Sequence, residues 1–355
     1  MMLRLRIAEL TPGMKLAENV YSFDHNQLIM SKGTVLDDAS ITKLAFYSII
    51  YVLIDDSKVI SVDSESYAAR MRQTPTFKKF KTDFEDFTGD FKKNIKETIS
   101  SGKPIETKPL IDPIYAMISG GSNLQEVFGM IHSLRSYDDA TYVHCINVAM
   151  ICNILGQWLK MSPDEIIILT EAGILHDIGK MEIPEDILNK PNKLTDEEYQ
   201  LIQTHPQRGY EILKNQQINE HVKLACLQHH ERCDGTGYPS NLRGEQIDKF
   251  ARIVAIADVY DAMTSARVYR EALCPFVAIQ MFEDEGLQKY DVEAIMTFLK
   301  NIVETYRQNR VRLNNGEEGE IIYIDPLHLA RPTIQCGDTY HDLSKEKTLY
   351  IEAIL

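Results

Sequence analysis

The stretch LTEAGILHDIGK, from Leu169 to Lys180, places an adjacent His176–Asp177 pair inside an apolar run. Apolar residues lie on both sides of the pair, which predicts a buried helix rather than a solvated one. An imidazole and a carboxylate are costly to bury unless a partner compensates them, and a divalent metal ion suits both groups. A two-residue pair is a weak signal by itself, so the rest of the chain must support it.

Further His and Asp residues lie in or at the ends of other helix-like segments. One of them, His205, ends a segment that begins with the capping-box residues Thr195 and Glu198. Buried ionisable groups on several helices favour a polynuclear metal site over scattered, unrelated residues. These additional candidates are His144, His205, His229, His230 and Asp258.

Longer motifs surround the candidate ligands in a definite order. HDIGK is followed by NKPNKLTDEEY, HHERCDGTGYP and ARIVAIADVYDAMTSARVYREAL. In order and spacing these segments resemble the HD-GYP family, a branch of the HD-domain metal-dependent phosphohydrolases. The resemblance runs from about His144 to the early 290s, roughly two-fifths of the chain.

The resemblance implies a mainly α fold, with an all-helical HD-domain metallohydrolase core. It also implies hydrolysis of cyclic di-GMP to the linear dinucleotide pGpG by a metal-bridged hydroxide, with onward cleavage to GMP left open. Two alternatives remain: a hydrolase of another cyclic dinucleotide, and a metal-bound, non-catalytic cyclic di-GMP receptor. An intact GYP loop argues against a guanosine alarmone as substrate. A full set of ligand residues argues against an inactive receptor.

The resemblance also assigns the metal ligands. One metal would be held by His144, His176, Asp177 and Asp258, and Asp177 would bridge to a second metal held by His205, His229 and His230. Two ions about 3.5–4 Å apart can activate a water, neutralise phosphoryl charge and fix in-line geometry. Such a ligand set suits Fe or Mn, and Zn also fits.

The predicted number of metal ions is two. Some members of the family hold a third ion with a Glu four residues before the first ligand His, a spacing that shares one helical face. Here that position is Ala140, whose methyl group cannot bind a metal. Asp139 and Asp138 are turned away from that face if the segment is helical.

Other residues are expected to act on the substrate or to orient the ligands. Asp177 and Lys180 are the expected catalytic residues, since Lys180 lies one turn after His176 in the predicted helix. Asp234 and Asp261 are expected to orient ligand residues or the loop rather than to bind metal. The expected substrate contacts are Lys180, Tyr238, Arg267 and Arg270, the last two because guanidinium groups match phosphate and guanine edges.

The amino-acid composition disfavours some classes of binding partner. The 355 residues are 44% hydrophobic and 25% charged, with a formal net charge of −14. An acidic chain opposes nonspecific binding to nucleic acid polymers or anionic membranes. No apolar run approaches the roughly 18 residues of a membrane span. The six Cys form no CxxC pair, which is typical of reduced thiols, and a cytoplasmic location is expected.

The chain divides into four predicted units. Five Phe from Phe77 to Phe91 recur every three or four residues, which predicts an amphipathic helix with a candidate break at Thr88–Gly89. The N-terminal unit (1–62) is open to several roles: sensing of an input, docking of a signalling partner, a homodimer contact, or a structural cap. No site is expected in the last unit. The units are a small α+β N-terminal domain (1–62), a helical linker region (63–121), the HD-GYP catalytic domain (122–306) and a C-terminal β appendage (307–355).

Overall fold

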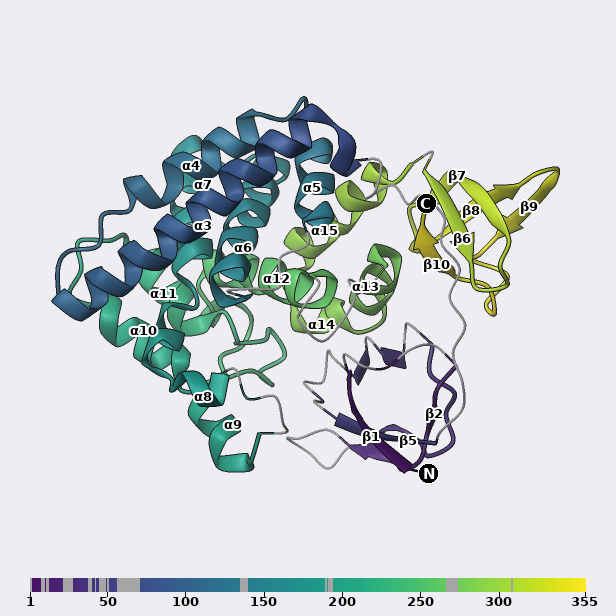
Figure 1. The fold of residues 1–355 in the computed structure, drawn as a ribbon, viewed down its shortest axis with the longest axis horizontal. Coiled ribbons are helices and arrows are strands. Elements are labelled where there is room, and N and C mark those ends of the chain that lie inside the picture. The colour runs from purple at the N-terminus through teal and green to yellow at the C-terminus, as the bar shows by residue number, and fades with distance from the viewer. Residues whose placement is uncertain are drawn as a thin grey trace.

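The structure, a computed structural model, consists of a helical body, a small N-terminal unit with strands and a C-terminal sheet (Figure 1). This arrangement confirms the predicted mainly α fold class with its two smaller parts. The described residues are 2–7, 10, 13–21, 28–37, 40–41, 43–44, 49, 51–55, 71–134, 140–188, 190, 194–265, 274–307 and 309–355.

The helical body spans α3 to α15 in the described part of the chain. Three short elements are not α-helical: η2 (Ile178–Glu182) and η3 (Gly244–Gln246) are 3₁₀ helices, and η4 (Phe282–Gly286) is a π-helix. The α-helices are α3 (Pro75–Ser101), α4 (Lys108–Ser119), α5 (Leu124–Ser133), α6 (Ala140–Trp158), α7 (Pro163–Leu175), α8 (Glu185–Leu188), α9 (Asp196–Ile202), α10 (His205–Leu213), α11 (Glu220–Gln228), α12 (Lys249–Thr264), α13 (Pro275–Met281), α14 (Leu287–Lys289) and α15 (Val292–Thr305).

Helix α3 is the predicted amphipathic helix, and the break expected at Thr88–Gly89 is wrong. The Thr88 hydroxyl donates to the Phe84 carbonyl at 2.7 Å, so this polar group is satisfied within the helix. Gly89 lies inside α3, which runs without a break to Ser101. The buried Phe stripe packs α3 against α4 and α6 (Figure 1).

Helices α6, α7 and α12 form the centre of the body, because each is apolar on nearly all sides and contacts the other two. The predicted helix through the HD pair ends earlier than expected. Helix α7 begins with a capping box formed by Ser162 and Glu165 and ends at Leu175. His176 is its C-cap, and Asp177 has φ −100° and ψ 12°, outside the α-helical region.

The N-terminal unit contains two antiparallel sheets. Strand β5 (Tyr51–Asp55) pairs with β1 (Met2–Arg6) on one side and with β2 (Lys15–Leu16) on the other. Strands β3 (Val20–Tyr21) and β4 (Leu28–Met30) form the second sheet. Residues 40–41 and 43–44 of this unit are helical, and the others between 38 and 47 lie outside the described residues.

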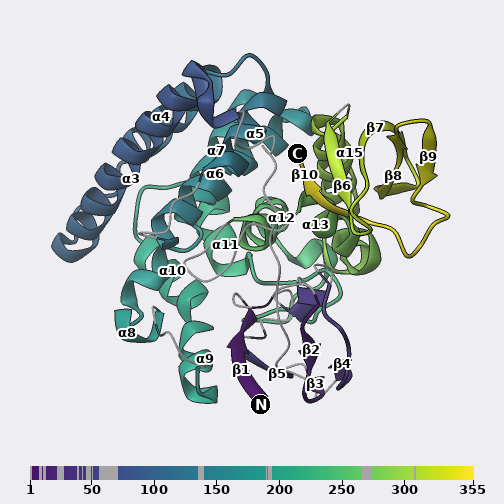
Figure 2. The same ribbon diagram turned by 45° about the vertical axis from the view of Figure 1, so that its right-hand side comes forward.

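The C-terminal sheet has the order β10-β6-β7-β8-β9, with all neighbours antiparallel. This sheet is the β appendage predicted at the C-terminus. In both ribbon views the sheet lies beside α13 and α15 (Figures 1 and 2). The strands are β6 (Arg310–Leu313), β7 (Glu318–Asp325), β8 (His328–Cys336), β9 (Thr339–Asp342) and β10 (Ile351–Ile354).

Two hydrophobic cores account for the packing of the described residues. One continuous core runs from Phe77 on α3 through the helical body to Ile351 in the C-terminal sheet. A separate core, from Ile7 to Ile54, belongs to the N-terminal unit. The unit boundaries at 62, 121 and 306 remain predictions, but the C-terminal sheet shares its core with the helices beside it.

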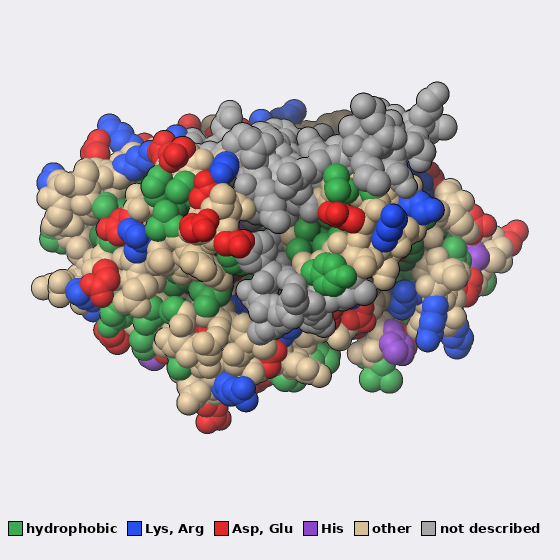
Figure 3. Space-filling view, turned by 90° about the horizontal axis from the view of Figure 1, so that it is seen from below, with side chains coloured by type: hydrophobic (Ala, Val, Ile, Leu, Met, Phe, Trp, Pro, Cys, Tyr) green, Lys and Arg blue, Asp and Glu red, His purple; other side chains and the backbone are tan. Residues whose placement is uncertain are grey.

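The described surface carries charges of both signs. On the face in Figure 3, Lys and Arg side chains are interspersed with Asp and Glu, and the described part of that face shows no continuous basic area. Within the ranges that the structure describes, none of the helices combines the length and the apolar character needed to cross a bilayer.

Candidate metal centre

Five helices of the body bring all seven predicted ligands to one place. The ligands fall into two groups, and within each group the potential metal-binding atoms all lie within 4.8 Å of one another. Six of the seven residues are buried, and His230 is half-buried. The first ligand group is His144 on α6, His176 at the end of α7 and Asp258 on α12; the second ligand group is Asp177 after α7, His205 on α10, and His229 and His230 at the end of α11.

In the first ligand group, His144 lies close to Asp258 and also to Asp177 of the second group. Its Nε2 atom is 3.0 Å from Asp258 Oδ1 and 3.7 Å from Asp177 Oδ2. His176 Nε2 is 3.3 Å from the same Asp177 oxygen and 3.9 Å from Asp258 Oδ1. Three nitrogen and oxygen donors from three separate helices therefore point at one small volume.

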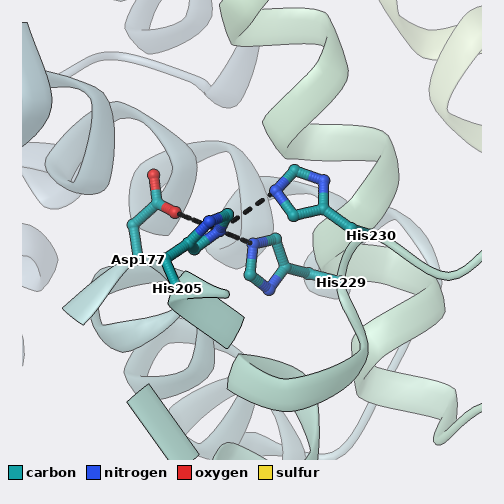
Figure 4. A group of neighbouring side chains, drawn as sticks. All are labelled: Asp177, His205, His229 and His230. Carbon is teal, nitrogen blue, oxygen red and sulfur yellow. Dashed lines mark hydrogen bonds and ion pairs between the residues drawn. The ribbon is translucent and has the colours of Figure 1, made fainter. Parts of the chain in front are cut away.

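In the second ligand group, three imidazole rings converge on each other (Figure 4). His205 Nε2 is 3.3 Å from His229 Nε2 and 3.1 Å from His230 Nε2. Asp177 Oδ1 lies 3.2 Å from His205 Nε2 and 3.7 Å from His229 Nε2. His205 is the first residue of α10 and follows α9, which ends at Ile202, so it begins a helix instead of ending one.

Asp177 joins the two groups. Its Oδ2 atom faces His144 and His176, whereas its Oδ1 atom faces His205 and His229. A carboxylate with one oxygen directed at each group has the geometry required to bridge two ions. Asp177 lies at the junction between α7 and η2, where the backbone leaves the α-helical conformation. This change of backbone direction places Asp177 between the two groups.

The second nitrogen of four rings is fixed by the protein. His176 Nδ1 is 2.7 Å from the Gly173 carbonyl, and His205 Nδ1 is 2.6 Å from the Ile202 carbonyl. His229 Nδ1 is 2.9 Å from the Cys226 carbonyl. His144 Nδ1 is 2.6 Å from Asp261 Oδ2. When Nδ1 donates to an oxygen, Nε2 keeps its lone pair, which is the tautomer that a metal ligand requires.

Two buried atoms at the middle of the cluster have no hydrogen-bond partner among the described residues. They are His176 Nε2 and Asp177 Oδ1. Buried polar atoms are normally satisfied, and an unsatisfied one calls for an explanation such as an ion. The donor set, imidazole nitrogens with carboxylate oxygens, is one that transition metals bind. The residues present therefore fit divalent metal ions, and the His/Asp cluster could bind them.

The protonation states in the second ligand group also favour metal binding. Burial lowers the pKa of His229 to about 4. Burial, reinforced by His229 and His205, lowers the pKa of His230 well below its usual value. Burial alone would raise the pKa of the Asp177 carboxyl, but Lys180 and His176 hold it well below its usual range. Neutral imidazoles and an ionised carboxylate are the forms that bind a metal.

Lys180 lies beside the bridging carboxylate. The prediction placed it on a helical face shared with His176, but α7 ends at Leu175 and Lys180 belongs to the 3₁₀ helix η2. Its ammonium group donates to Asp177 Oδ2 at 2.5 Å. A 3₁₀ helix turns faster per residue than an α-helix, so the four-residue spacing no longer fixes which side chains share a face.

The loop after His230 is held by a residue that sequence reasoning missed. The buried Glu231 carboxylate accepts the backbone N–H groups of Ser240 at 2.6 Å and Leu242 at 3.0 Å. Tyr238 stacks on His230, with ring centroids 4.7 Å apart and an interplanar angle of 20°. A charged residue directly after the His pair was the available signal for Glu231.

The two residues predicted to orient ligands have different surroundings. Asp261 contacts His144, and its Oδ1 atom accepts hydrogen bonds from Asn147 at 2.9 Å and Ser265 at 2.6 Å. Asp234 accepts from the Thr236 backbone N–H and hydroxyl, so its described contacts shape the loop. Asn147 and Ser265 were not predicted. A polar residue one turn after His144 in an apolar helix was the signal for Asn147.

Some predicted site residues lie outside the described residues. Arg267 and Arg270 fall in 266–273, and Asp138 and Asp139 fall in 135–139. Helix α6 includes Ala140, so the four-residue spacing from Ala140 to His144 is helical.

Known proteins match this region of the chain. A family model described as HD domain matches residues 126–294. A cyclic di-GMP phosphodiesterase from Pseudomonas aeruginosa is 37% identical over 240 residues, which is 66% of this chain and 56% of the relative. A cyclic di-GMP phosphodiesterase response regulator from Xanthomonas campestris is 44% identical over 174 residues, 48% of this chain and 46% of the relative.

A third relative carries a different substrate in its name. The 3'3'-cGAMP-specific phosphodiesterase 1 of Vibrio cholerae is 41% identical over 154 residues, 42% of this chain and 36% of the relative. The chain spans about half the length of the first two relatives. The matched region contains every residue of both ligand groups. The family model and the relatives confirm the resemblance predicted from the motifs: residues 126–294 match an HD domain, and these matches are consistent with the HD-GYP family.

Proposed function

We propose that the protein is a metal-dependent phosphodiesterase that hydrolyses cyclic di-GMP to the linear dinucleotide pGpG. The observation that carries this proposal is the paired cluster of ligands, in which Asp177 directs one oxygen to each group. The proposal is supported by two relatives that are named cyclic di-GMP phosphodiesterases and are 37% and 44% identical to this chain. Onward cleavage of pGpG to GMP is a question for product analysis.

Two divalent ions, Fe or Mn with Zn also compatible, are the proposed cofactors. The first ligand group with Asp177 Oδ2 would hold one ion, and the second ligand group would hold the other. When bound, such a pair supplies an activated water and neutralises charge on the phosphoryl oxygens. Ala140 offers no ligand at the third-ion position, so two ions are expected at the His/Asp centre.

Lys180 and Tyr238 are the proposed substrate contacts among the described residues. Burial favours a neutral amine at Lys180, but Asp177 and Asp258 raise its pKa, so it stays an ammonium ion at neutral pH. This cation can donate to a phosphate oxygen or to the leaving oxygen. Burial raises the pKa of Tyr238 well above its usual value, so its hydroxyl stays neutral and able to donate. Its ring also offers a face to a guanine base.

A second cyclic dinucleotide is the competing substrate. The Vibrio cholerae relative that is 41% identical is named a 3'3'-cGAMP-specific phosphodiesterase. The two nucleotides share the phosphodiester ring and differ in one base, so the metal centre itself does not distinguish them. The choice depends on residues that contact the bases.

The deciding experiment combines metal analysis with product chromatography on one purified sample. Cyclic di-GMP and 3'3'-cGAMP are supplied side by side to the full chain and to Asp177→Ala. Loss of an outer-shell partner costs roughly 10–100-fold in metal affinity or activity, and loss of the bridging ligand is expected to cost more. Asp177→Ala should therefore abolish hydrolysis while circular dichroism shows the helical fold retained.

The control is Asp164→Ala, which removes an exposed carboxylate from the start of the same helix, α7. It should hydrolyse at the rate of the unchanged chain. Faster turnover of 3'3'-cGAMP would reassign the substrate. A fully metal-loaded protein that binds cyclic di-GMP without cleaving it would show a receptor instead of an enzyme. Full activity of Asp177→Ala at normal metal content would overturn the bridging assignment.

A further inference from the structure

The C-terminal sheet brings together three residues of metal-ligating type, far in sequence from the centre described above. They are Glu317, Cys336 and His341, and their potential ligand atoms all lie within 4.8 Å of one another. Glu317 lies in the turn between β6 and β7, Cys336 ends β8, and His341 lies in β9. Sequence reasoning expected no site in this unit, because the three residues form no recognisable spacing.

The strand register explains why they meet. In the β8–β9 hairpin, Ile334 pairs with His341 and Cys336 pairs with Thr339. Residues two apart share a face of a strand, so Cys336 and His341 lie on the face of the fully buried Ile334. Gly319 on β7 leaves the space that Cys336 occupies, since a Cβ there would lie 2.6 Å from the Cys336 Sγ atom. The thiol is thereby held beside the turn that carries Glu317.

The His341 ring is already oriented as a ligand would be. Its Nδ1 atom is 3.0 Å from Glu346 Oε2, a carboxylate of the kind that fixes metal-ligating imidazoles from behind. Its Nε2 atom is buried and has no aligned hydrogen bond within the described chain. Glu317 Oε2 nevertheless lies 3.0 Å from that Nε2 atom. Two ligands of one tetrahedral ion, each about 2.0 Å from it, are separated by about 3.3 Å.

We propose that Cys336 Sγ, His341 Nε2 and the Glu317 carboxylate bind a divalent cation, with water in the fourth position. A thiolate, an imidazole and a carboxylate in one site favour Zn²⁺. On binding, the Cys336 thiol releases its proton to solvent and becomes a thiolate bonded to the ion. The ion would tie the β6–β7 turn to the β8–β9 hairpin, in addition to the β7–β8 ladder that already joins the two hairpins. Its role is to stabilise the C-terminal sheet.

A purely ionic explanation competes with this one. A protonated His341 between Glu346 and Glu317 forms two ion pairs without any metal. Those ion pairs explain why the two carboxylates lie beside the His341 ring, but they do not involve Cys336. The thiol is therefore the group that the experiment must follow.

Cobalt(II) distinguishes the new site from the His/Asp centre. The purified full chain, stripped of metal, is titrated with Co²⁺ and followed by absorption spectroscopy. Both ligand groups of the His/Asp centre consist of nitrogen and oxygen donors, so only a site with a thiolate gives a sulfur-to-cobalt charge-transfer band. We expect that band in the unchanged chain, and we expect added Zn²⁺ to remove it.

Two substitutions and one control complete the test. Cys336→Ser should lose the band, and His341→Gln should weaken Co²⁺ binding at this site by roughly tenfold or more, with hydrolytic activity unchanged in both. Cys274→Ser, which removes a thiol on another element, should keep the band. Circular dichroism checks that each variant is folded. Absence of the band in the unchanged chain, or its persistence in Cys336→Ser, would overturn the proposal.

Discussion

Single side chains around the ligands determine how firmly the proposed ions are held, and Asp261 is the clearest case. It contacts His144 Nδ1 at 2.6 Å and is itself fixed by Asn147 and Ser265. Asp261→Ala should lower metal affinity by roughly 10–100-fold, since the His144 ring loses both its orientation and its basicity. The measurement is the metal retained against increasing chelator. Asp234→Ala, whose described contacts are with Thr236, is the control and should retain metal normally.

A second residue-scale prediction concerns substrate affinity. Arg267 and Arg270 lie outside the described residues, and their role stays a prediction from the family resemblance. Changing either to Ala should weaken nucleotide binding, including that of the product pGpG, by about 1–3 kcal/mol, the range for losing a charge-assisted hydrogen bond. Calorimetry on an inactive Asp177→Ala background is unsuitable because the metals are disturbed there. Binding is therefore measured with pGpG, and elemental analysis should show unchanged metal content.

At the residue scale, the sequence named the seven residues that the structure brings together, but few of their supporting contacts. The seven candidate ligands could be named because their motifs are long and resemble one family. Glu231 could not be assigned its partners, because its two backbone N–H donors lie nine and eleven residues further along a loop. Lys180 was placed on the wrong local structure, since nothing in HDIGK distinguishes an α-helical turn from a 3₁₀ turn.

At the scale of elements, the approach of η2 to α10 positions His205, and Gly179 permits that approach. A Cβ at Gly179 would lie 1.9 Å from the His205 carbonyl oxygen and 2.5 Å from the Gly209 nitrogen. Both are backbone atoms that cannot rotate away. Gly179→Ala should therefore destabilise the protein by about 1–3 kcal/mol or more. It should also displace His205 and lower metal content. Denaturant unfolding and elemental analysis measure the two effects.

The matched control is Gly89→Ala on α3. Gly89 is helical and has nothing within 4 Å of the position that a Cβ would take. Ala is preferred over Gly inside a helix by about 0.5–1 kcal/mol, so this variant should be slightly more stable. Equal stability changes in the two variants would mean that the η2–α10 approach is not tightly packed.

Element boundaries were predictable where local chemistry marks them. Ser162 and Thr195 cap their helices as their capping-box patterns indicate. The end of α7 has no comparable sequence signal, because the apolar run continues from Leu175 into Ile178. In strand β9 polar and apolar residues do not alternate clearly, because the strand is polar and lies at the edge of the sheet.

On the scale of the whole molecule, the π-helix η4 connects units that the sequence suggested were separate. Its half-buried Glu283 carboxylate accepts the backbone N–H groups of Leu329 at 2.6 Å and Ala330 at 3.2 Å, both on β8. Its Glu285 carboxylate lies 3.7 Å from Lys43 of the N-terminal unit. After η4, the Lys289 carbonyl accepts the Cys233 N–H in the loop beside the metal centre. π-helical turns inside helices are frequent at functional positions.

The final prediction tests which of these connections contributes to stability. Glu283→Ala leaves two N–H groups on β8 without their described acceptor, and an unsatisfied buried donor costs about 1–3 kcal/mol. Glu285→Ala removes ion pairs with Lys43 and Lys289, which join partly exposed side chains and contribute about 1 kcal/mol each at most. The two variants lie on the same short element and lose the same type of side chain. Denaturant unfolding should therefore show a clear loss of stability for Glu283→Ala and a small loss for Glu285→Ala.

One core continues from the helices into the C-terminal sheet. The helices and the C-terminal sheet of the Glu283→Ala protein should therefore still unfold together in a single transition. A separate early transition of the C-terminal sheet would show that Glu283, and not the shared core, joins them.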